Sequence, residues 1–278
     1  MLKKLSGIIL IIAGLFFFVT AIKTIFVDIP KAKSALKEVV YVGDEALHAE
    51  NEGKTVIVCG ALELTEPSYD DELGLAFDSI RISRSKQTMR RDKSTSNSKQ
   101  TLKNLTDEEK RYGVLKWGTT TSEKTYSGEG KIGDYTLSQD FIDAIRLNTT
   151  WNHYDEAELK AAGYAYVPDS SFTQKDFIEP LAQTQRNNAE NDVRYFYSAS
   201  DFKTGDTVTA LGIQDGQTLR SAPEVTDNLQ KGALDRETAI KQGGAPGIGA
   251  SIFSIVFSLL LLAGGAIMSS LVKVNSTL

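Results

Sequence analysis

Two long apolar stretches, one near each end of the chain, enclose a middle part that is mostly polar. The first runs from Ile8 to Phe26 and contains a single charged residue, Lys23, near its end. At about 1.5 Å of rise per residue it covers roughly 28 Å, close to the hydrocarbon thickness of a bilayer. The second runs from Gly247 to Val272 and carries no charge. The pattern therefore predicts transmembrane helices at residues 8–26 and 247–272.

The first apolar stretch also has features of a cleaved signal peptide. Lys3 and Lys4 would form its basic start, and Val19–Ala21 resembles a small-x-small cleavage site. The apolar character continues past Ala21 to Phe26, which favours a retained helix. A secreted protein that loses this segment remains an alternative.

The polar middle, residues 27–246, alternates short segments of helix and strand periodicity. Helical spacing predicts helices at Pro30–Val40, at Leu137–Leu147 (or an edge strand there), within Ser171–Gln185, and in a lead-in to the second membrane segment with Leu229, Leu234 and Ile240. Predicted strands are Thr55–Leu62, Leu75–Ile82, Val114–Thr120, Tyr164–Val167, Val193–Tyr197 and Thr207–Ile213. Asp215–Gly216 predicts a tight turn into a last strand, Gln217–Arg220. The fold class is therefore α+β, a mainly antiparallel β domain with a few helices, flanked by two transmembrane helices.

Two segments of the middle are too polar or too rich in glycine for regular structure. Thr88 to Leu105 is rich in Ser, Lys and Asn, which indicates an exposed loop or a hairpin tip. Gly243–Gly247, directly before the second membrane segment, reads as a hinge.

The orientation in the membrane depends on more than the positive-inside rule. Lys3 and Lys4 lie on one side of the first segment, and Lys31, Lys33 and Lys37 lie on the other, so the lysine count does not decide. A short basic start before an apolar stretch is typical of a signal anchor. We therefore expect a cytoplasmic N-terminus (1–7), an extracytoplasmic domain (27–246) and a short C-terminal tail (273–278).

Small residues recur every four positions at the start of the second apolar stretch. Ala250, Ser254 and Ser258 form a stripe that would let another helix approach closely. The partner would be the first segment or a second copy of this one. Small residues are also simply common in membrane helices, so a stripe without a partner is the alternative.

Charge and cysteine content exclude several classes of function. The chain has 278 residues, 24% of them charged, and a net charge of -5, which argues against non-specific binding of nucleic acid. Cys59 is the single cysteine, so intramolecular disulfides, zinc–thiolate sites and iron–sulfur clusters are excluded. Its apolar neighbours predict an inert, buried thiol.

Candidate catalytic chemistry is sparse. His48 and His153 are the only histidines, and the sequence contains no His-x-x-x-His pair, phosphate loop or Gly-x-Ser-x-Gly elbow. His153 stands beside Asp155 and Glu156, a group that is either catalytic, metal-binding or part of a solvated loop. The acidic Asp70–Glu72 segment would bind a cation or form an exposed turn. We expect no catalytic residue, cofactor or metal site.

Several segments, in order along the chain, resemble the transmembrane protein 43 (LUMA) family. Four features carry the resemblance. They are an Asn-Glu-Gly-Lys entry to an apolar strand, an acidic segment followed by an Arg-containing strand, a later Asp-x-Arg strand and a closing hairpin. The matching residues are Asn51, Glu52, Gly53, Lys54, Gly60, Arg81, Arg194, Gly212 and Gly216. In Asn51–Gly53 we expect a turn with Gly53 at positive φ, which explains the motif structurally.

This resemblance implies a scaffold rather than an enzyme. Animal members are scaffolds of the endoplasmic reticulum and inner nuclear membrane that associate with themselves and with other membrane proteins. This chain has one C-terminal helix where they have several, and Tyr126–Arg186 matches poorly. The short tail and the lack of eukaryotic signals favour a bacterial homologue in the cell membrane; a eukaryotic one would lie in the endoplasmic reticulum or nuclear membrane. The layout is also similar to GIDE-type ligases, but one cysteine cannot build their RING. A membrane-tethered enzyme acting on a lipid or envelope polymer is the rival reading.

Overall fold

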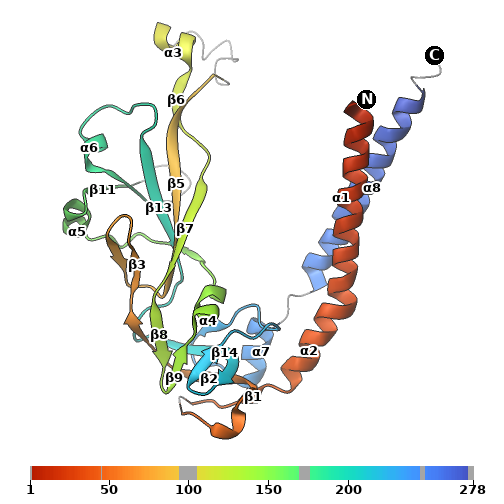
Figure 1. Ribbon diagram of the computed structural model, residues 1–278, viewed down its shortest axis with the longest axis vertical. Helices are drawn as coiled ribbons and strands as arrows, with labels where there is room; N and C mark the ends of the chain where they lie inside the picture. Colours follow the sequence, from red (N-terminus) through yellow and green to blue (C-terminus); the bar gives the residue numbers. More distant parts are fainter. Residues whose placement is uncertain (1, 45, 94–104, 169–175, 245–247, 275–278) are drawn as a thin grey trace.

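Two long helices lie side by side and rise from one end of a β-rich domain (Figure 1). The computed structural model describes residues 2–44, 46–93, 105–168, 176–244 and 248–274. Helix α1 (Leu2–Lys23) and helix α8 (Ile248–Val274) run antiparallel, so that the start of α1 and the end of α8 lie at the same end of the pair. By length and composition, Leu5–Lys37 and Ser251–Met268 can each cross a membrane. The expected terminal apolar helices are thus present.

The chain enters the β domain through a continuous helical segment. Helix α1 passes through a π-helical turn (Thr24–Asp28) into α2 (Ile29–Lys37), where the Ile29 amide donates back to the Thr24 carbonyl and Pro30, which has no amide hydrogen, lies in the first turn. Ile29 and Leu36 are the buried positions of α2, and its charged residues face outward. The amphipathic helix predicted at Pro30–Val40 is confirmed, although it ends at Lys37.

Five strands close into a barrel below the helix pair. Around the barrel they follow the order β2 (Thr55–Glu66), β8 (Glu129–Ile132), β9 (Tyr135–Leu137), β15 (Thr218–Arg220) and β14 (Thr207–Asp215), which returns to β2. Only the β9–β15 pair in this ring is parallel. With a helix, α4 (Gln139–Ala144), after the third strand, this is the topology of an OB-type barrel. Two short strands extend it: β1 (Val40–Tyr41) beside β2 and β16 (Leu229–Lys231) beside β14.

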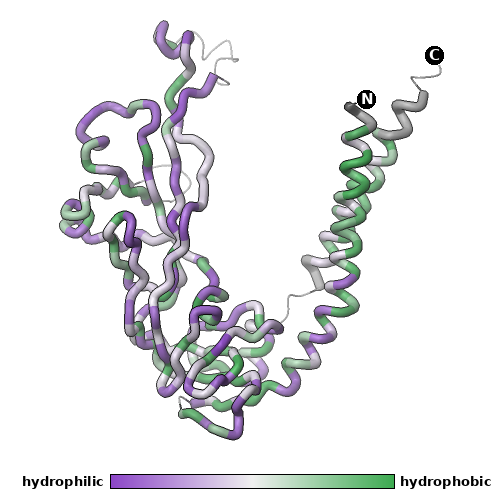
Figure 2. Tube along the Cα trace, in the orientation of Figure 1, coloured by the Kyte–Doolittle hydropathy of each residue, from purple (hydrophilic) through white to green (hydrophobic). Residues whose placement is uncertain are grey.

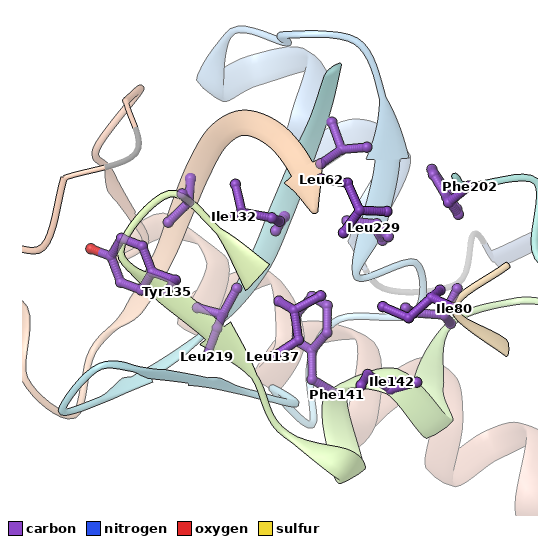
Figure 3. Packing of buried hydrophobic residues seen from close by; sticks show 14 of the residues in the cluster. Leu62, Ile80, Ile132, Tyr135, Leu137, Phe141, Ile142, Phe202, Leu219 and Leu229 are labelled. Carbon is purple, nitrogen blue, oxygen red and sulfur yellow. The ribbon is translucent and has the colours of Figure 1, made fainter. Parts of the chain in front are cut away.

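Both faces of strand β2 are covered, which explains its unbroken apolar run. Val56, Val58 and Leu62 point into the barrel, where α4 closes one end with Phe141 and Ile142 (Figure 3). Ile57 and Cys59 point outward and pack beneath α2 and α7 (Arg236–Gly243). A strand covered on both sides needs apolar residues at every position instead of alternate ones.

A second sheet rises from the barrel as an arm (Figure 1). Its main path is β11 (Tyr164–Val167), β12 (Phe177–Pro180), β13 (Val193–Ala199), β5 (Arg81–Asp92) and β6 (Val114–Trp117). Strand β7 (Thr121–Ser127) pairs with β5, β10 (Thr149–Thr150) pairs with β13, and β3 (Ser68–Asp70) forms a hairpin with β4 (Leu75–Phe77). Short helices η2 (Ala49–Asn51), α3 (Asp107–Tyr112), α5 (Glu156–Ala161) and α6 (Leu181–Thr184) complete the described elements. All arm strands come from two insertions between successive barrel elements.

The structure corrects four of the expected elements. Leu75–Ile82 is not one strand: β4 ends at Phe77, the chain bends, and β5 begins at Arg81, because Phe77 packs in the arm core and Ile80 in the barrel core. Strand β5 then continues to Asp92, through the first part of the expected loop, because β6 pairs with it as far as Asp92. The rest of that loop, 94–104, lies outside the described residues.

The other two corrections concern predicted helices. Phe177–Pro180 is strand β12, and only Leu181–Thr184 is helical, because β12 pairs with β11 along its whole length. Leu229 belongs to strand β16, and Leu234 lies in a loop. Of the three residues expected in a helix before the second membrane segment, only Ile240 lies in α7. Of the predicted hinge, Gly243 ends α7, and 245–247 lie outside the described residues.

Candidate functional site

A seam of small residues joins α1 to α8. Gly7, Gly14 and Ala21 are buried on α1, and Ser251, Ser258 and Gly265 are buried on α8, each set repeating every seven residues. A Cβ atom at Gly14 would lie 2.8 Å from Leu262 Cγ, and one at Gly265 would lie 2.7 Å from the Gly7 carbonyl oxygen. The backbones of α1 and α8 therefore lie too close together for larger side chains at these positions. Small residues allow the same close approach in helix pairs within membranes.

The residues of the helix pair are mostly hydrophobic (Figure 2), and many of their large apolar side chains are exposed. Outside α1, its π-helical extension and α8, the only large apolar side chains that are exposed in the described part of the chain are Tyr41, Tyr69 and Tyr112. Thr20 and Thr24, which lie on α1 and its extension, donate their hydroxyl groups to carbonyls four residues earlier, so they carry no unsatisfied donor into this surface. This is the surface expected of helices that face lipid.

The predicted stripe on α8 is only partly in the seam. Ser258 is fully buried there, and its hydroxyl donates to the Ile255 carbonyl at 2.7 Å. Ser254 is half-buried, and the Ala250 side chain lies outside the described part of the chain. A repeat of seven, instead of four, keeps the same face of α8 against α1 over several turns.

The Asn-Glu-Gly-Lys motif forms hydrogen bonds to the β14–β15 hairpin of the barrel. The Gly53 amide donates to the Gln214 carbonyl at 2.9 Å, and the Gln214 amide donates to the Lys54 carbonyl at 3.0 Å. Glu52 accepts a hydrogen bond from the Gly216 amide at 2.9 Å, in the turn between β14 and β15. Gly53 and Gly216 have φ of 72° and 59°, where a side chain is disfavoured. Asn51 is buried beside them.

The remaining family-motif residues also have structural surroundings. Gly60 faces Val208 across the β2–β14 ladder, and a Cβ at Gly212 would lie 2.5 Å from the Arg220 carbonyl. Arg81 donates to the Ile145 carbonyl. The guanidinium carbon of Arg194 lies 3.6 Å from the Phe177 ring centroid and 4.4 Å from the Trp117 ring centroid. The motif residues thus stabilise the barrel and the arm separately, and Arg81 alone of this set links the two.

The acidic Asp70–Glu72 segment contains a buried ion pair. Asp70 is fully buried and accepts hydrogen bonds at 2.8 and 2.9 Å from Nη1 of Arg84 and at 2.6 Å from the Tyr197 hydroxyl. Arg84 also donates to Glu72 and, at 2.9 Å, to Glu123. The expectation of a plain exposed turn is wrong for Asp70, because this carboxylate serves as the counterion of a buried guanidinium.

Burial and charge act in opposite directions on the pKa of Arg84. Desolvation alone would lower it, but the hydrogen bond to Glu72 and the charge of Asp70 raise the pKa above its ordinary value. Burial, followed by the hydrogen bond to Asp70, raises the pKa of the Tyr197 hydroxyl. Both groups therefore keep their protons at neutral pH, and the cluster functions as a fixed structural ion pair.

A cleft of about 390 Å³ lies where the arm meets the barrel. It is lined by His153 and Trp151 with Asp78, Asp201 and Asp206, and by two lysines. Lys231 pairs with Asp201 at 2.8 Å. Of the predicted neighbours of His153, Glu156 does not line this cleft, and Asp155 lies with His153 only around a smaller pocket of about 200 Å³. Asp155 instead caps α5 by accepting from the Ala157 and Glu158 amides, and Glu156 is exposed in that helix.

Neither histidine belongs to a metal site among the residues that the structure describes. No group of three His, Cys, Asp or Glu side chains is arranged there to hold an ion. His48 lies near Asp44 and Glu50 at the surface. Cys59 is buried, as predicted, with its sulfur 3.3 Å from the Thr209 hydroxyl.

Comparison with known proteins adds no relative. A scan against protein-family models and searches of curated proteins and solved structures find no match to this chain.

The sequence did not predict the Arg84–Asp70–Tyr197 cluster or the seam glycines of α1. The seven-residue spacing of Gly7, Gly14 and Ala21 was the readable signal for the seam.

Proposed function

We propose that this chain is a membrane-anchored scaffold or interaction protein, similar to the transmembrane protein 43 family, in which α1 and α8 form a transmembrane hairpin. One observation carries the proposal: the helix pair buries small residues in its seam and presents large apolar residues outward. The motif residues and the buried Arg84 cluster have structural partners, which supports an interaction domain in preference to an active site. Because the seam is filled by α1 and α8 themselves, self-association would use the outer helix faces or the β domain.

A membrane-tethered enzyme is the second candidate, and the cleft around His153 is the observation that favours it. Its carboxylates would be Asp78, Asp201 and Asp206, instead of the predicted Asp155 and Glu156. Activity on an envelope polymer or lipid that His153→Gln abolishes, with folding intact, would establish this reading and displace the scaffold.

Impermeant thiol labelling tests the proposed location in a bacterial cell membrane, with the domain outside. In a Cys59→Ser background, we expect intact cells to label Ser122→Cys, on exposed strand β7, but not Ser276→Cys near the C-terminus. The β domain would face the envelope and both termini the cytoplasm. Labelling of residue 276 alone would invert the orientation and make the partner cytosolic.

Retention of the first helix is expected from its packing. Cleavage after Ala21 would remove Gly7 and Gly14 and leave the seam of α8 without a partner. We therefore expect the intact mass of the purified protein to include residues 1–21. A mass that begins at Ile22 would support the secreted alternative.

The arm and the helix pair rise from the same side of the barrel, and the arm is hydrophilic (Figures 1 and 2). Polar strands do not share the depth of hydrocarbon with helices that face lipid. We therefore expect the helix pair to tilt away from the arm in a bilayer, about the π-helical turn. Spin labels at Lys116 on β6 and Ile267 on α8 should lie farther apart in nanodiscs than their Cα atoms do in the structure. An equal separation would contradict the tilt.

A further inference from the structure

A groove of about 360 Å³ lies between α2 and α7, at the base of the helix pair (Figure 1). We call it the juxtamembrane groove. Its walls carry Lys33 and Lys37 of α2 and Arg236 and Lys241 of α7, with Leu36 and Ile240 between them. Glu237 is the single acidic side chain among its lining residues.

The groove is a local excess of positive charge in an acidic protein. The chain as a whole has a net charge of -5, whereas four of the groove residues are cationic and one is anionic. Lys33, Lys37 and Lys241 are exposed, and none of them forms an ion pair with a side chain in the described part of the structure. Lys124 and Lys231, by contrast, are each paired with a carboxylate at 2.8 Å. Unpaired cations gathered around one hollow favour an anionic ligand.

The groove is held open by contacts within the domain. Arg236 donates to the Lys37 carbonyl at 2.8 Å and to the Val39 carbonyl at 3.2 Å, which ties the start of α7 to the end of α2. Leu36 is buried, and a Cβ at Gly244 would lie 2.9 Å from its Cδ1 atom, so the other end of α7 also packs against α2. The lysines therefore project from two helices whose relative position is fixed.

The position of the groove points to the membrane interface. Phe26 is the last residue of the predicted apolar stretch, and Lys33 comes seven residues later, which corresponds to about 10 Å along the helix axis. Headgroups occupy roughly 5–8 Å on each side of the hydrocarbon, and a lysine side chain reaches several ångströms towards them. Helix α8 begins at Ile248, shortly after Gly244. Both membrane-spanning helices thus meet the domain beside the groove.

We propose that the juxtamembrane groove binds the headgroup of an anionic phospholipid. The three lysines and Arg236 face the phosphate, and Leu36 and Ile240 contact the less polar part of the headgroup. Basic pockets beside membrane helices recognise anionic headgroups by the same combination of charge and shape. This inference rests on the proposed membrane anchoring and names the chemistry of one partner.

The test uses the full chain in neutral detergent and a short-chain anionic lipid, dioctanoyl phosphatidylglycerol. We expect saturable binding by isothermal titration, which dioctanoyl phosphatidylcholine and inorganic phosphate at the same concentrations do not reproduce. The triple variant Lys33→Gln/Lys37→Gln/Lys241→Gln should weaken binding at least tenfold. The matched variant Lys110→Gln/Lys116→Gln/Lys160→Gln changes the net charge equally, at exposed sites on α3, β6 and α5, and should bind as the parent does.

Four outcomes would overturn the proposal: no saturable binding, equal binding of the phosphatidylcholine, equal binding of inorganic phosphate, or equal loss in both triple variants. Equal binding of inorganic phosphate would assign the groove to free phosphate. Circular dichroism of each variant shows that the fold is retained. Carbonate extraction of membranes tests anchoring separately. A chain that resists extraction but binds no phosphatidylglycerol would refute the lipid inference and leave the anchoring intact.

Discussion

Replacing Gly265 by leucine is expected to separate α8 from α1, whereas the same replacement at Gly264 is expected to leave the pair intact. A Cβ at Gly265 meets the Gly7 carbonyl oxygen and Ile11 Cγ1, both at 2.7 Å, and backbone in a packed helix cannot move aside locally. A Cβ at Gly264 meets nothing within 4 Å. Overpacking of this kind costs about 1–3 kcal/mol, and the remaining atoms of leucine add to it. The two variants differ by one position and share the same change in volume and hydropathy.

Cross-linking between Phe17→Cys and Phe257→Cys measures the pairing. The two rings lie across the helix interface, with their centroids 6.1 Å apart, so a short bifunctional thiol reagent should link these positions in a Cys59→Ser background. We expect Gly265→Leu to abolish the cross-link and Gly264→Leu to retain it. Equal cross-linking of both variants would show that the seam does not hold the helices together.

Replacing Asp70 by alanine is expected to destabilise the arm by about 3–5 kcal/mol, the usual loss when one partner of a buried ion pair is removed. The change removes two hydrogen bonds from Arg84 Nη1 and one from Tyr197, and it leaves a guanidinium with 4% side-chain exposure short of a counterion. The amides of Glu72 and Leu73 lose their acceptor as well. The free energy of unfolding, from urea titrations followed by circular dichroism, measures the loss.

Two further variants separate charge from packing. Asp71→Ala, at the neighbouring exposed carboxylate that pairs with Lys124, should change stability little, because solvent screens surface ion pairs. Asp70→Leu/Arg84→Met should be more stable than Asp70→Ala, since the buried guanidinium is removed together with its fully buried counterion. If Asp71→Ala proved as damaging as Asp70→Ala, general loss of negative charge in this segment would be responsible instead of the buried pair.

Local periodicity predicted the terminal helices, α2, β2 and the β14–β15 hairpin. The unbroken apolar run of Thr55–Leu62 and the Asp215–Gly216 turn are signals carried within a few residues. The bend after Phe77 left no such signal, because Leu75–Ile82 is apolar enough for one strand. The segment is divided into two strands because Phe77 packs in the core of the arm and Ile80 packs in the core of the barrel.

The buried cluster illustrates what a single sequence leaves out. Asp70, Arg84 and Tyr197 come from β3, β5 and β13, and Tyr197 is 127 positions away from Asp70. Only the pairing of β13 with β5 brings Tyr197 beside the ion pair. A run of carboxylates on its own indicates solvent exposure, and only tertiary structure reverses that reading.

The order of synthesis gives the helix seam a further consequence. Helix α1 is made first, and the whole β domain, residues 27–246, is made before α8. At about 5–20 residues per second, α1 waits on the order of 10–40 s for its partner. During this interval Gly7, Gly14 and Ala21 are uncovered and can meet the seam face of α8 on a neighbouring chain whose synthesis is more advanced. Strand β2 waits similarly for β14, so the barrel and the helix hairpin both close within the last quarter of translation. Crowded polysomes should therefore favour exchanged dimers in which α1 of one chain packs on α8 of another.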